Sequence, residues 1–385
     1  MNKEGSVGEE RSVPKKILIL TASIGSGHTK AAEALATELR RALPDAEITT
    51  VDFMARRISC LNALMKKIYL VMLDFVPNLY DVFYKVSGGK AGGKAAQGAF
   101  AVVMVRAMRR LLHRYDPDLV LCTHPFPEGA AALVKRVSGG AFTLATVMTD
   151  YSLHSIWLYP LVDHYFMATE EMRAGMIARG FLEETLHVTG IPVARSLVLL
   201  PERDSVRHAM AIPDGQHTIL LMGGGLGLGG IEETLEALSC IEERLTLFVV
   251  AGRNAGLKER VQDFADRSHH QVLVWGYTDQ VHALMRAADL LITKPGGLTM
   301  SEAFVLGLPM LLHDPIPGPE TENAIYATSH GAAVWLHPGE SLARAVRDLL
   351  AGSRLPAMRD AALRCKRANA AADIVGILLH PEQQQ

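Results

Sequence analysis

The chain has 385 residues, of which 49% are hydrophobic and 21% are charged. These proportions are typical of soluble globular proteins and exclude a mainly disordered or fibrous chain, and the length predicts two domains. Four scattered cysteines without C-x-x-C spacing indicate reduced thiols in a cytoplasmic protein and exclude a disulfide framework or a cysteine zinc site.

The basic residues are unevenly distributed. Residues 55–115 contain eleven Lys or Arg and two Asp, a net charge of +9, whereas the remainder has 28 basic and 39 acidic residues. A basic segment in an otherwise acidic protein favours an anionic surface as partner. No run of about 20 apolar residues occurs, and the polar N-terminal sequence does not resemble a signal peptide, so we expect no membrane span.

The first half of the chain alternates short apolar strands with helices. After a tail over residues 1–14, which we expect to be disordered, the apolar run 16–22 predicts a buried parallel strand. A helix at 29–41 and a strand at 48–53 complete a β–α–β unit, which predicts a doubly wound sheet with its ligand crevice at the carboxyl ends of the strands. Beyond 55–115, which is helical in pattern, strands return at 119–123, 143–149, 164–168 and 186–188.

The second half repeats this organisation after a polar connector. It opens with a strand at 218–222, the glycine loop GGGLGLGG at 223–230 and a helix at 232–243. Strands are expected at 245–251, 272–275, 290–293 and 309–313, and helices at 280–287 and 299–306. We therefore predict an α/β protein with domains at 15–195 and 196–370. The tail 371–385 either packs back on the N-terminal domain or frays.

A glycine turn and a histidine follow the first strand. In the sequence SIGSGH at 23–28, Gly25 and Gly27 let the backbone approach a ligand, and the next helix offers its N-terminal N–H groups. His28 is a candidate general base in the crevice, with helix capping as the alternative. The third glycine of the dinucleotide fingerprint is absent, which argues against a dehydrogenase.

Two other polar groups follow strands of the first half. Asp150, in the sequence VMTDY with His154 and Trp157 after it, lies where open α/β sheets place ligands. Its carboxylate can orient an imidazole or accept a hydroxyl proton, with capping of the next turn as the alternative. His124, in the sequence THPF, has a similar position, and a strand-end turn is an equally good interpretation.

A third group extends from Gly276 to Asn323. The sequence KPGG at 294–297 lies between a strand and a helix, where N–H groups can hold a diphosphate. Glu302, one helical turn further on, has suitable reach for the cis hydroxyls of a ribose. The sequence GPETEN at 318–323 supplies carboxylate and amide groups suited to sugar hydroxyls.

These motifs resemble one enzyme family over about residues 15–370. KILILTASIGSGHTKAAEAL, THPFPEG, VMTDYSLHSIW and KPGGLTMSEAFVLGLPMLLHDPIPGPETEN are similar to monogalactosyldiacylglycerol synthases and processive diacylglycerol glucosyltransferases. These are GT-B glycosyltransferases, more distantly similar to the lipid II-forming N-acetylglucosaminyltransferase. The resemblance implies two Rossmann-like domains facing across a cleft and transfer of glucose or galactose from a UDP-sugar to diacylglycerol.

The resemblance also implies roles for residues at matching positions. The C-terminal half would bind the UDP-sugar, with Glu302 on the ribose, Glu320 and Asn323 on the sugar, and Tyr277 and Thr278 beside uracil. The remaining implied donor residues are Gly223, Gly224, Gly225, Arg253, Lys294, Gly296, Gly297, Thr299 and Gly318. Pro319 stands where the family usually has Gln, which leaves the identity of the donor sugar open.

The N-terminal half would bind the lipid acceptor. His28 is then the general base, Asp150 supports it, and the reaction inverts the configuration at the anomeric carbon. The residues expected around the acceptor are Gly25, Gly27, His124, Tyr151, His154 and Trp157. We expect no metal or other cofactor, because helix N-termini and basic side chains can stabilise the departing UDP. The D-x-D sequence at 116–118 precedes a strand and should lie away from the crevice.

The basic segment 55–115 then suggests membrane docking. Helices with Leu, Met, Tyr and Phe on one side and basic residues on the other favour an anionic lipid interface. We expect Lys66, Lys67, Arg106, Arg109 and Arg110 to place the protein on the inner face of the cell membrane, with a solvated face covering a core as the alternative. No aromatic-basic motif supports nucleic-acid binding. Two other functions stay open, namely transfer to another lipid such as a polyprenyl-linked intermediate, and non-catalytic sensing of a nucleotide-sugar or lipid.

Overall fold

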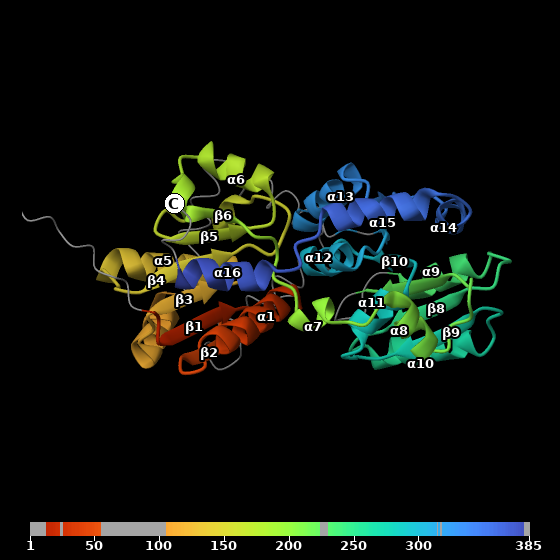
Figure 1. Cartoon of the computed structure of the whole chain (residues 1–385), viewed down its shortest axis with the longest axis horizontal. Coiled ribbons are helices and arrows are strands. Elements are labelled where there is room, and N and C mark those ends of the chain that lie inside the picture. The colour runs from red at the N-terminus through yellow and green to blue at the C-terminus, as the bar shows by residue number, and fades with distance from the viewer. Residues whose placement is uncertain are drawn as a thin grey trace, which may run out of the picture.

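The computed structural model describes residues 13–23, 26–54, 105–223, 230–313, 315 and 318–380. Within these ranges it contains two six-stranded parallel sheets with helices against them. Figure 1 shows the two sheets side by side along the long axis of the molecule. The predicted α/β class with two doubly wound halves is therefore confirmed.

The first sheet is built from the strands of the N-terminal half. It contains β1 (Lys16–Thr21), β2 (Glu47–Asp52), β3 (Leu119–Cys122), β4 (Thr143–Val147), β5 (His164–Met167) and β6 (Leu186–Val188), in the spatial order β2-β1-β3-β4-β5-β6. The central strands are buried on both faces, which is why they occur in the sequence as short unbroken apolar runs. The strand order reverses between β1 and β3, because the chain goes outward to β2 before it returns.

The second sheet has the equivalent arrangement. It contains β7 (Thr218–Met222), β8 (Thr246–Val250), β9 (Gln271–Trp275), β10 (Leu290–Thr293), β11 (Met310–Leu312) and β12 (Ala333–Trp335), in the order β12-β11-β10-β7-β8-β9. Here the order reverses between β7 and β10. In open α/β sheets such a reversal opens a crevice at the carboxyl ends of the two strands, where ligands bind.

The helices of the first domain begin and end at recognisable signals. They are α1 (Gly27–Ala42), α5 (Pro125–Ser138) and α6 (Glu170–Ile177), together with a helix over 105–115 and the 3₁₀ turns η1 (Ser155–Trp157) and η2 (Glu183–Thr185). The side chain of His124 caps the N-terminus of α5, and Pro125 occupies its first position. Gly139 ends the same helix with φ +62°, a conformation that glycine adopts without strain.

The second domain has more helices than the sequence predicts. They are α8 (Arg203–Ala209), α9 (Ile231–Leu238), α10 (Ala255–Ala265), α11 (Val281–Ala287), α12 (Gly297–Leu306), α13 (Pro319–Ser329), α14 (Leu342–Leu350) and α15 (Arg354–Arg364). The helix expected over 232–243 ends at Leu238. The sequence GPETEN proves to be the first turn of a helix, since Gly318 at φ +100° precedes it and Pro319 occupies the first position, where a missing N–H has no effect.

Within the residues that the structure describes, the chain crosses between the domains twice. The first crossing is through the short helix α7 (Arg195–Val198), and the second leads from α15 to α16 (Ala370–Leu379). Figure 1 shows α16 in blue across the N-terminal domain beside α1. Ile374, Val375 and Ile377 share a buried cluster with Ile19 and Leu35, so the last described helix completes the N-terminal core.

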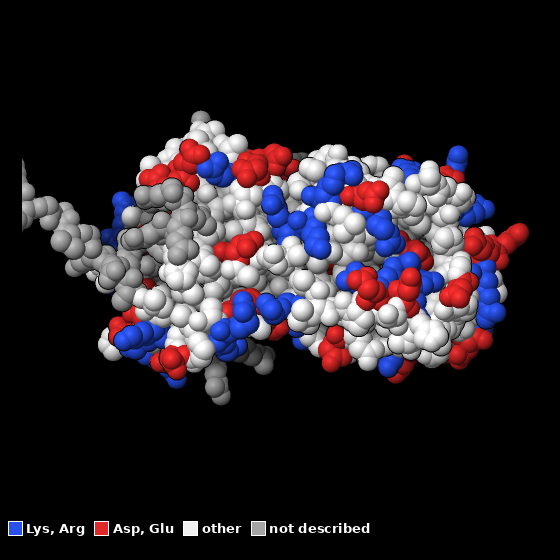
Figure 2. Space-filling model, viewed as in Figure 1, with Lys and Arg blue, Asp and Glu red and all other residues white. Residues whose placement is uncertain are grey.

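Nothing in the described parts of the chain is long and apolar enough to cross a bilayer as a helix. On the face shown in Figure 2, basic and acidic side chains are interspersed. The described residues on that face therefore form no large surface of a single charge.

Candidate active site

The residues predicted to carry chemistry lie at the carboxyl ends of the strands where each sheet reverses. His28 follows β1, and Thr123 follows β3. In the second domain, Gly223 follows β7 and Lys294 follows β10. The N-termini of α1 and α12 are close across the domain boundary, because a β-carbon placed on Gly27 would lie 3.6 Å from the β-carbon of Leu298. The structure therefore brings the two predicted half-sites together.

Hydrogen bonds fix the orientation of the His28 ring. Its Nδ1 lies 2.8 Å from the carbonyl oxygen of Thr123 and 2.7 Å from the hydroxyl of Thr149. Since a carbonyl oxygen can only accept, Nδ1 carries the hydrogen, and a neutral ring then has its lone pair on Nε2. Among the described residues none hydrogen-bonds to Nε2. The Thr123 hydroxyl donates in turn to the His28 carbonyl oxygen at 3.0 Å.

The surroundings of His28 favour its neutral form near neutral pH. Burial lowers the pKa of His28, and the opposing influences are the charge of Asp150 and the bond to Thr123. A neutral imidazole is the form that can take a proton from a substrate hydroxyl. Once the proton has been taken, the negative charge of Asp150 stabilises the imidazolium. The sequence-based pairing of Asp150 with His28 therefore has an electrostatic basis.

Two of the other aromatic residues predicted near an acceptor lie beside His28. The rings of His124 and Trp157 lie 4.6 and 6.5 Å from the His28 ring, centroid to centroid. The Nδ1 atoms of His124 and His154 accept backbone N–H bonds that cap α5 and η1. Burial holds the pKa of His124 well below its ordinary value, and the neighbouring His28 lowers it further. Both histidines thus cap the element that follows them, in agreement with the strand-end turn considered for His124, and their predicted contact with an acceptor stays a prediction.

Residues 149–151 of the first domain are inserted between α12 and α13 of the second. Asn323, which is fully buried, donates to Asp150 Oδ1 at 3.1 Å and to the Pro295 carbonyl oxygen at 3.0 Å. Its own amide oxygen accepts from the backbone N–H of Tyr151 at 2.7 Å. These bonds use both N–H groups of the Asn323 amide and one of the two acceptor positions on its oxygen. Its predicted contact with the donor sugar stays a prediction.

The Tyr151 side chain lies in the same interface. Its hydroxyl is 2.8 Å from Ser301 Oγ in α12, and its ring stacks on Tyr326 of α13 at a centroid distance of 4.5 Å. Phe304 contacts the Tyr151 ring edge-on. Tyr151 therefore anchors the first domain on the second, and its predicted contact with an acceptor stays a prediction.

The N-terminus of α12 is the candidate diphosphate site. Gly296 precedes the helix without a side-chain capping bond, which leaves the first N–H groups and the positive end of the helix dipole for an anion. A β-carbon on Gly297 would overlap the carbonyl oxygen of Thr149, so only glycine permits this close approach of the two domains. Lys294 and Thr299 are partly exposed beside this terminus.

Glu302 lies deeper in α12 and has an unexpected partner. The residue is buried, and its Oε1 accepts a hydrogen bond from Nε2 of His282 in α11 at 2.9 Å. Arg253, after β8, stacks over the exposed ring of Tyr277 with its guanidinium carbon 4.8 Å from the ring centroid. Thr278 Oγ1 accepts the backbone N–H of Gln280 just before α11.

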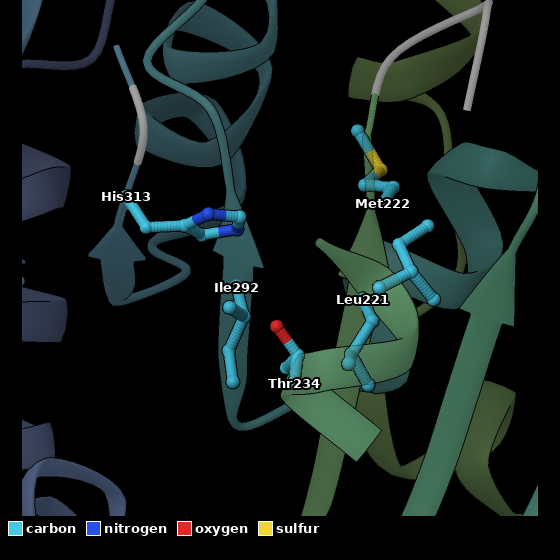
Figure 3. Close-up of a pocket in the computed structure, with 6 residues that line it drawn as sticks. Leu221, Met222, Thr234, Ile292 and His313 are labelled. Carbon is cyan, nitrogen blue, oxygen red and sulfur yellow. The ribbon is translucent and has the colours of Figure 1, made fainter. Parts of the chain in front are cut away.

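A small pocket lies at the carboxyl ends of β7 and β10. Figure 3 shows His313 of the β11 end directed toward Met222 of β7 across the end of β10, with Thr234 of α9 below. Its interior has essentially no volume that a water molecule could occupy, whereas small-molecule sites typically offer roughly 300–1,000 Å³. This pocket by itself therefore does not hold a nucleotide.

The remaining predicted residues divide into two groups. Gly318 and Glu320 begin α13 near the interface, whereas Gly25, Gly224, Gly225, Lys66 and Lys67 lie outside the described residues.

Asp118 accepts the backbone N–H groups of Lys15 and Lys16 before β3 begins, so the D-x-D sequence lies at the opposite end of the sheet, as predicted. Over the described ranges, no cluster of His, Cys, Asp or Glu has the arrangement of a metal site.

Sequence analysis did not identify two residues of the candidate site, Thr149 and His282. Thr149 was within reach of sequence reasoning, since it directly precedes Asp150 at the carboxyl end of β4. His282 was not, because it belongs to no motif and only the packing of α11 on α12 brings it to Glu302.

Two family models match the chain, one on each domain. The model for monogalactosyldiacylglycerol (MGDG) synthase matches residues 28–193, and that for glycosyl transferases group 1 matches residues 202–366. A processive diacylglycerol β-glucosyltransferase of Bacillus cytotoxicus is 31% identical over 372 residues, which cover 96% of this chain and 95% of the relative. The chain belongs to the diacylglycerol glycosyltransferase family.

Other comparisons agree with this assignment. The processive diacylglycerol β-glucosyltransferase of Bacillus cereus strain AH187 is 30% identical over 94% of this chain and 93% of the relative. MurG of Acinetobacter baumannii superposes with a TM-score of 0.62 at 17% identity, over 94% of this chain and 98% of MurG. The UDP complex of Staphylococcus aureus MnaA also gives 0.62, at 13% identity and over 96% and 98% of the two chains. These structures confirm the GT-B fold, and the relatives confirm the family resemblance and a glycosyltransferase activity.

Proposed function

We propose that this member of the family transfers glucose from UDP-glucose to the hydroxyl of diacylglycerol and inverts the anomeric carbon to give a β-glucoside. The sugar and the lipid are those named by the relatives, which are diacylglycerol β-glucosyltransferases at about 30% identity. The observation that carries the chemical step is the bonding of His28, which holds Nδ1–H and leaves the Nε2 lone pair available.

In the proposed reaction His28 is the general base. Nε2 takes the proton of the acceptor hydroxyl, and the oxygen of that hydroxyl forms a bond to C1 of the sugar. At the same time, the bond between C1 and the diphosphate oxygen breaks. Asp150 stabilises the imidazolium through its charge, as its effect on the pKa of His28 indicates. The proton then passes to solvent, and UDP leaves.

The second domain is proposed to hold the donor. The N-terminus of α12 stabilises the negative charge that grows on the leaving diphosphate, with Lys294 and Arg253 as basic side chains nearby. Glu302 accepts the ribose hydroxyls, Tyr277 lies beside uracil, and Glu320 contacts the sugar. The proposal requires no metal, because the helix terminus and the basic side chains supply the positive potential.

We further propose that the protein docks on anionic membrane surfaces. In the helix over 105–115, Met108 is buried and the flanking apolar residues pack against the core, whereas Arg106, Arg109 and Arg110 are exposed. Docking through this helix is therefore electrostatic, since its apolar side is already covered by the protein.

The experiment that tests the function is UDP release by the purified protein. UDP-glucose and UDP-galactose are offered separately, with diacylglycerol in anionic mixed micelles and, in a parallel series, a polyprenyl phosphate. We expect release that requires both UDP-glucose and diacylglycerol, with a β-anomeric product. Release with the polyprenyl acceptor alone would reassign the acceptor, and UDP binding without turnover would indicate a sensor.

A further inference from the structure

The pairing of His282 with Glu302 has a geometry that bears on nucleotide selection. The carboxylate of Glu302 is mostly buried, with 11% of its side chain exposed, and His282 has 22% exposed. A carboxylate in such a position needs hydrogen bonds to stabilise its charge. The 2.9 Å contact from Nε2 of His282 supplies one to Oε1.

This contact leaves most of the carboxylate available. A carboxylate offers about four acceptor positions on its two oxygens, and His282 occupies one of them. None of the described residues hydrogen-bonds to the other oxygen, Oε2. The carboxylate can therefore accept hydrogen bonds from two neighbouring hydroxyl groups at the same time, provided that it is held in one rotamer.

His282 is suited to hold the Glu302 carboxylate in one rotamer because the backbone of His282 is fixed. It lies in the first turn of α11, which packs against α12, and Leu284 and Met285 of the same helix are fully buried. The imidazole thus approaches Glu302 from a rigid element. Loss of the N–H donor would leave the glutamate side chain free to change rotamer and would leave its charge less stabilised.

We propose that His282 is a positioning residue that fixes Glu302 for recognition of a ribose, and that it thereby sets the preference of this enzyme for ribonucleoside over 2′-deoxyribonucleoside diphosphates. This inference rests on the proposed function, in which Glu302 accepts the ribose hydroxyls. It adds a residue that does not itself touch the donor but determines how strongly the cis-diol is selected.

The test compares UDP with 2′-deoxy-UDP by calorimetric titration of the full-length protein. His282→Leu removes the donor, and His282→Gln keeps an N–H near the position of Nε2. We expect the affinity ratio of UDP to 2′-deoxy-UDP to fall by about tenfold in His282→Leu, the loss expected for one hydrogen bond to a charged group. The glutamine variant should retain most of the ratio. His217→Leu, at the amino end of β7, is the matched control and should leave it unchanged.

The outcomes separate the inference from the proposed function. If the wild-type protein binds neither nucleotide, both fail. If it prefers UDP but His282→Leu keeps the same ratio, the positioning role is wrong and the function stands. Weaker binding of both nucleotides by the same factor also overturns the proposal, because it indicates general damage to the site. His282→Ala, checked by circular dichroism, replaces the leucine variant if that one does not fold.

Discussion

At the scale of single residues, the bonds around His28 determine which of its two ring nitrogens is available to a substrate. The ring is held from two strands at once, by the Thr123 carbonyl after β3 and by the Thr149 hydroxyl after β4. Both partners meet Nδ1, so rotation of the ring to present Nδ1 to a substrate would break two hydrogen bonds. The fold therefore leaves Nε2 as the nitrogen available to act as the proposed base.

The first prediction concerns this base. His28→Ala should lower kcat by about 10²-fold or more, as loss of a general base does, and leave UDP affinity nearly unchanged. Because burial lowers the pKa of His28, wild-type turnover should persist below pH 6.5, where an ordinary histidine is already protonated, and should fall only when His28 gains its proton. Turnover measured from pH 5 to 9 checks both points. Normal turnover in the alanine variant would remove His28 from the mechanism.

At the scale of elements, the contact between residues 149–151 and the helices α12 and α13 links the two half-sites. One short segment contributes the Thr149 hydroxyl to His28 and the Thr149 carbonyl to the neighbourhood of Gly297. The next two residues bond to Asn323. A shift of the second domain relative to the first would therefore move residues that contact the proposed base.

Asn323→Asp tests the strength of this link. The substitution keeps the shape but replaces an amide donor with an oxygen that faces Asp150 and the Pro295 carbonyl. Two buried bonds are lost, so we expect a destabilisation of about 2 kcal/mol or more, or a fall in melting temperature of about 4 °C or more. The loss should be largest at pH 7.5 and smaller at pH 5.5, because protonation of the new carboxyl restores one donor.

Thermal unfolding at the two pH values measures this effect. Asn369→Asp is the control, since Asn369 is exposed before α16 and its side chain makes no capping bond. Equal melting temperatures for the two variants at pH 7.5 would show that the buried amide contributes little to the interface.

At the scale of the whole molecule, the sequence predicts the two sheets but not their contact. The strands were recognisable because a buried parallel strand is a short apolar run, and the carboxyl ends followed from the turns after them. The bond from Tyr151 to Asn323 joins residues 172 positions apart, and no local pattern records such a pair. Helix α13 was missed because Gly318 and Pro319 are typical of a loop until the structure shows them starting a helix.

The last prediction concerns the proposed docking of the molecule on anionic membranes. Arg106, Arg109 and Arg110 project from a helix whose other side belongs to the core, so their replacement by Gln should alter surface charge without exposing apolar groups. Each basic residue near an anionic surface contributes about 1 kcal/mol, and we expect the triple variant to bind anionic vesicles at least about tenfold more weakly in low salt, with UDP affinity unchanged. Vesicle co-sedimentation measures the difference.

The control replaces Arg344, Arg347 and Arg354, which are exposed on the second domain, and so makes the same change in net charge. Equal losses in both triple variants would mean that net charge alone governs binding, whereas a loss confined to the first would assign the docking surface to the helix over 105–115.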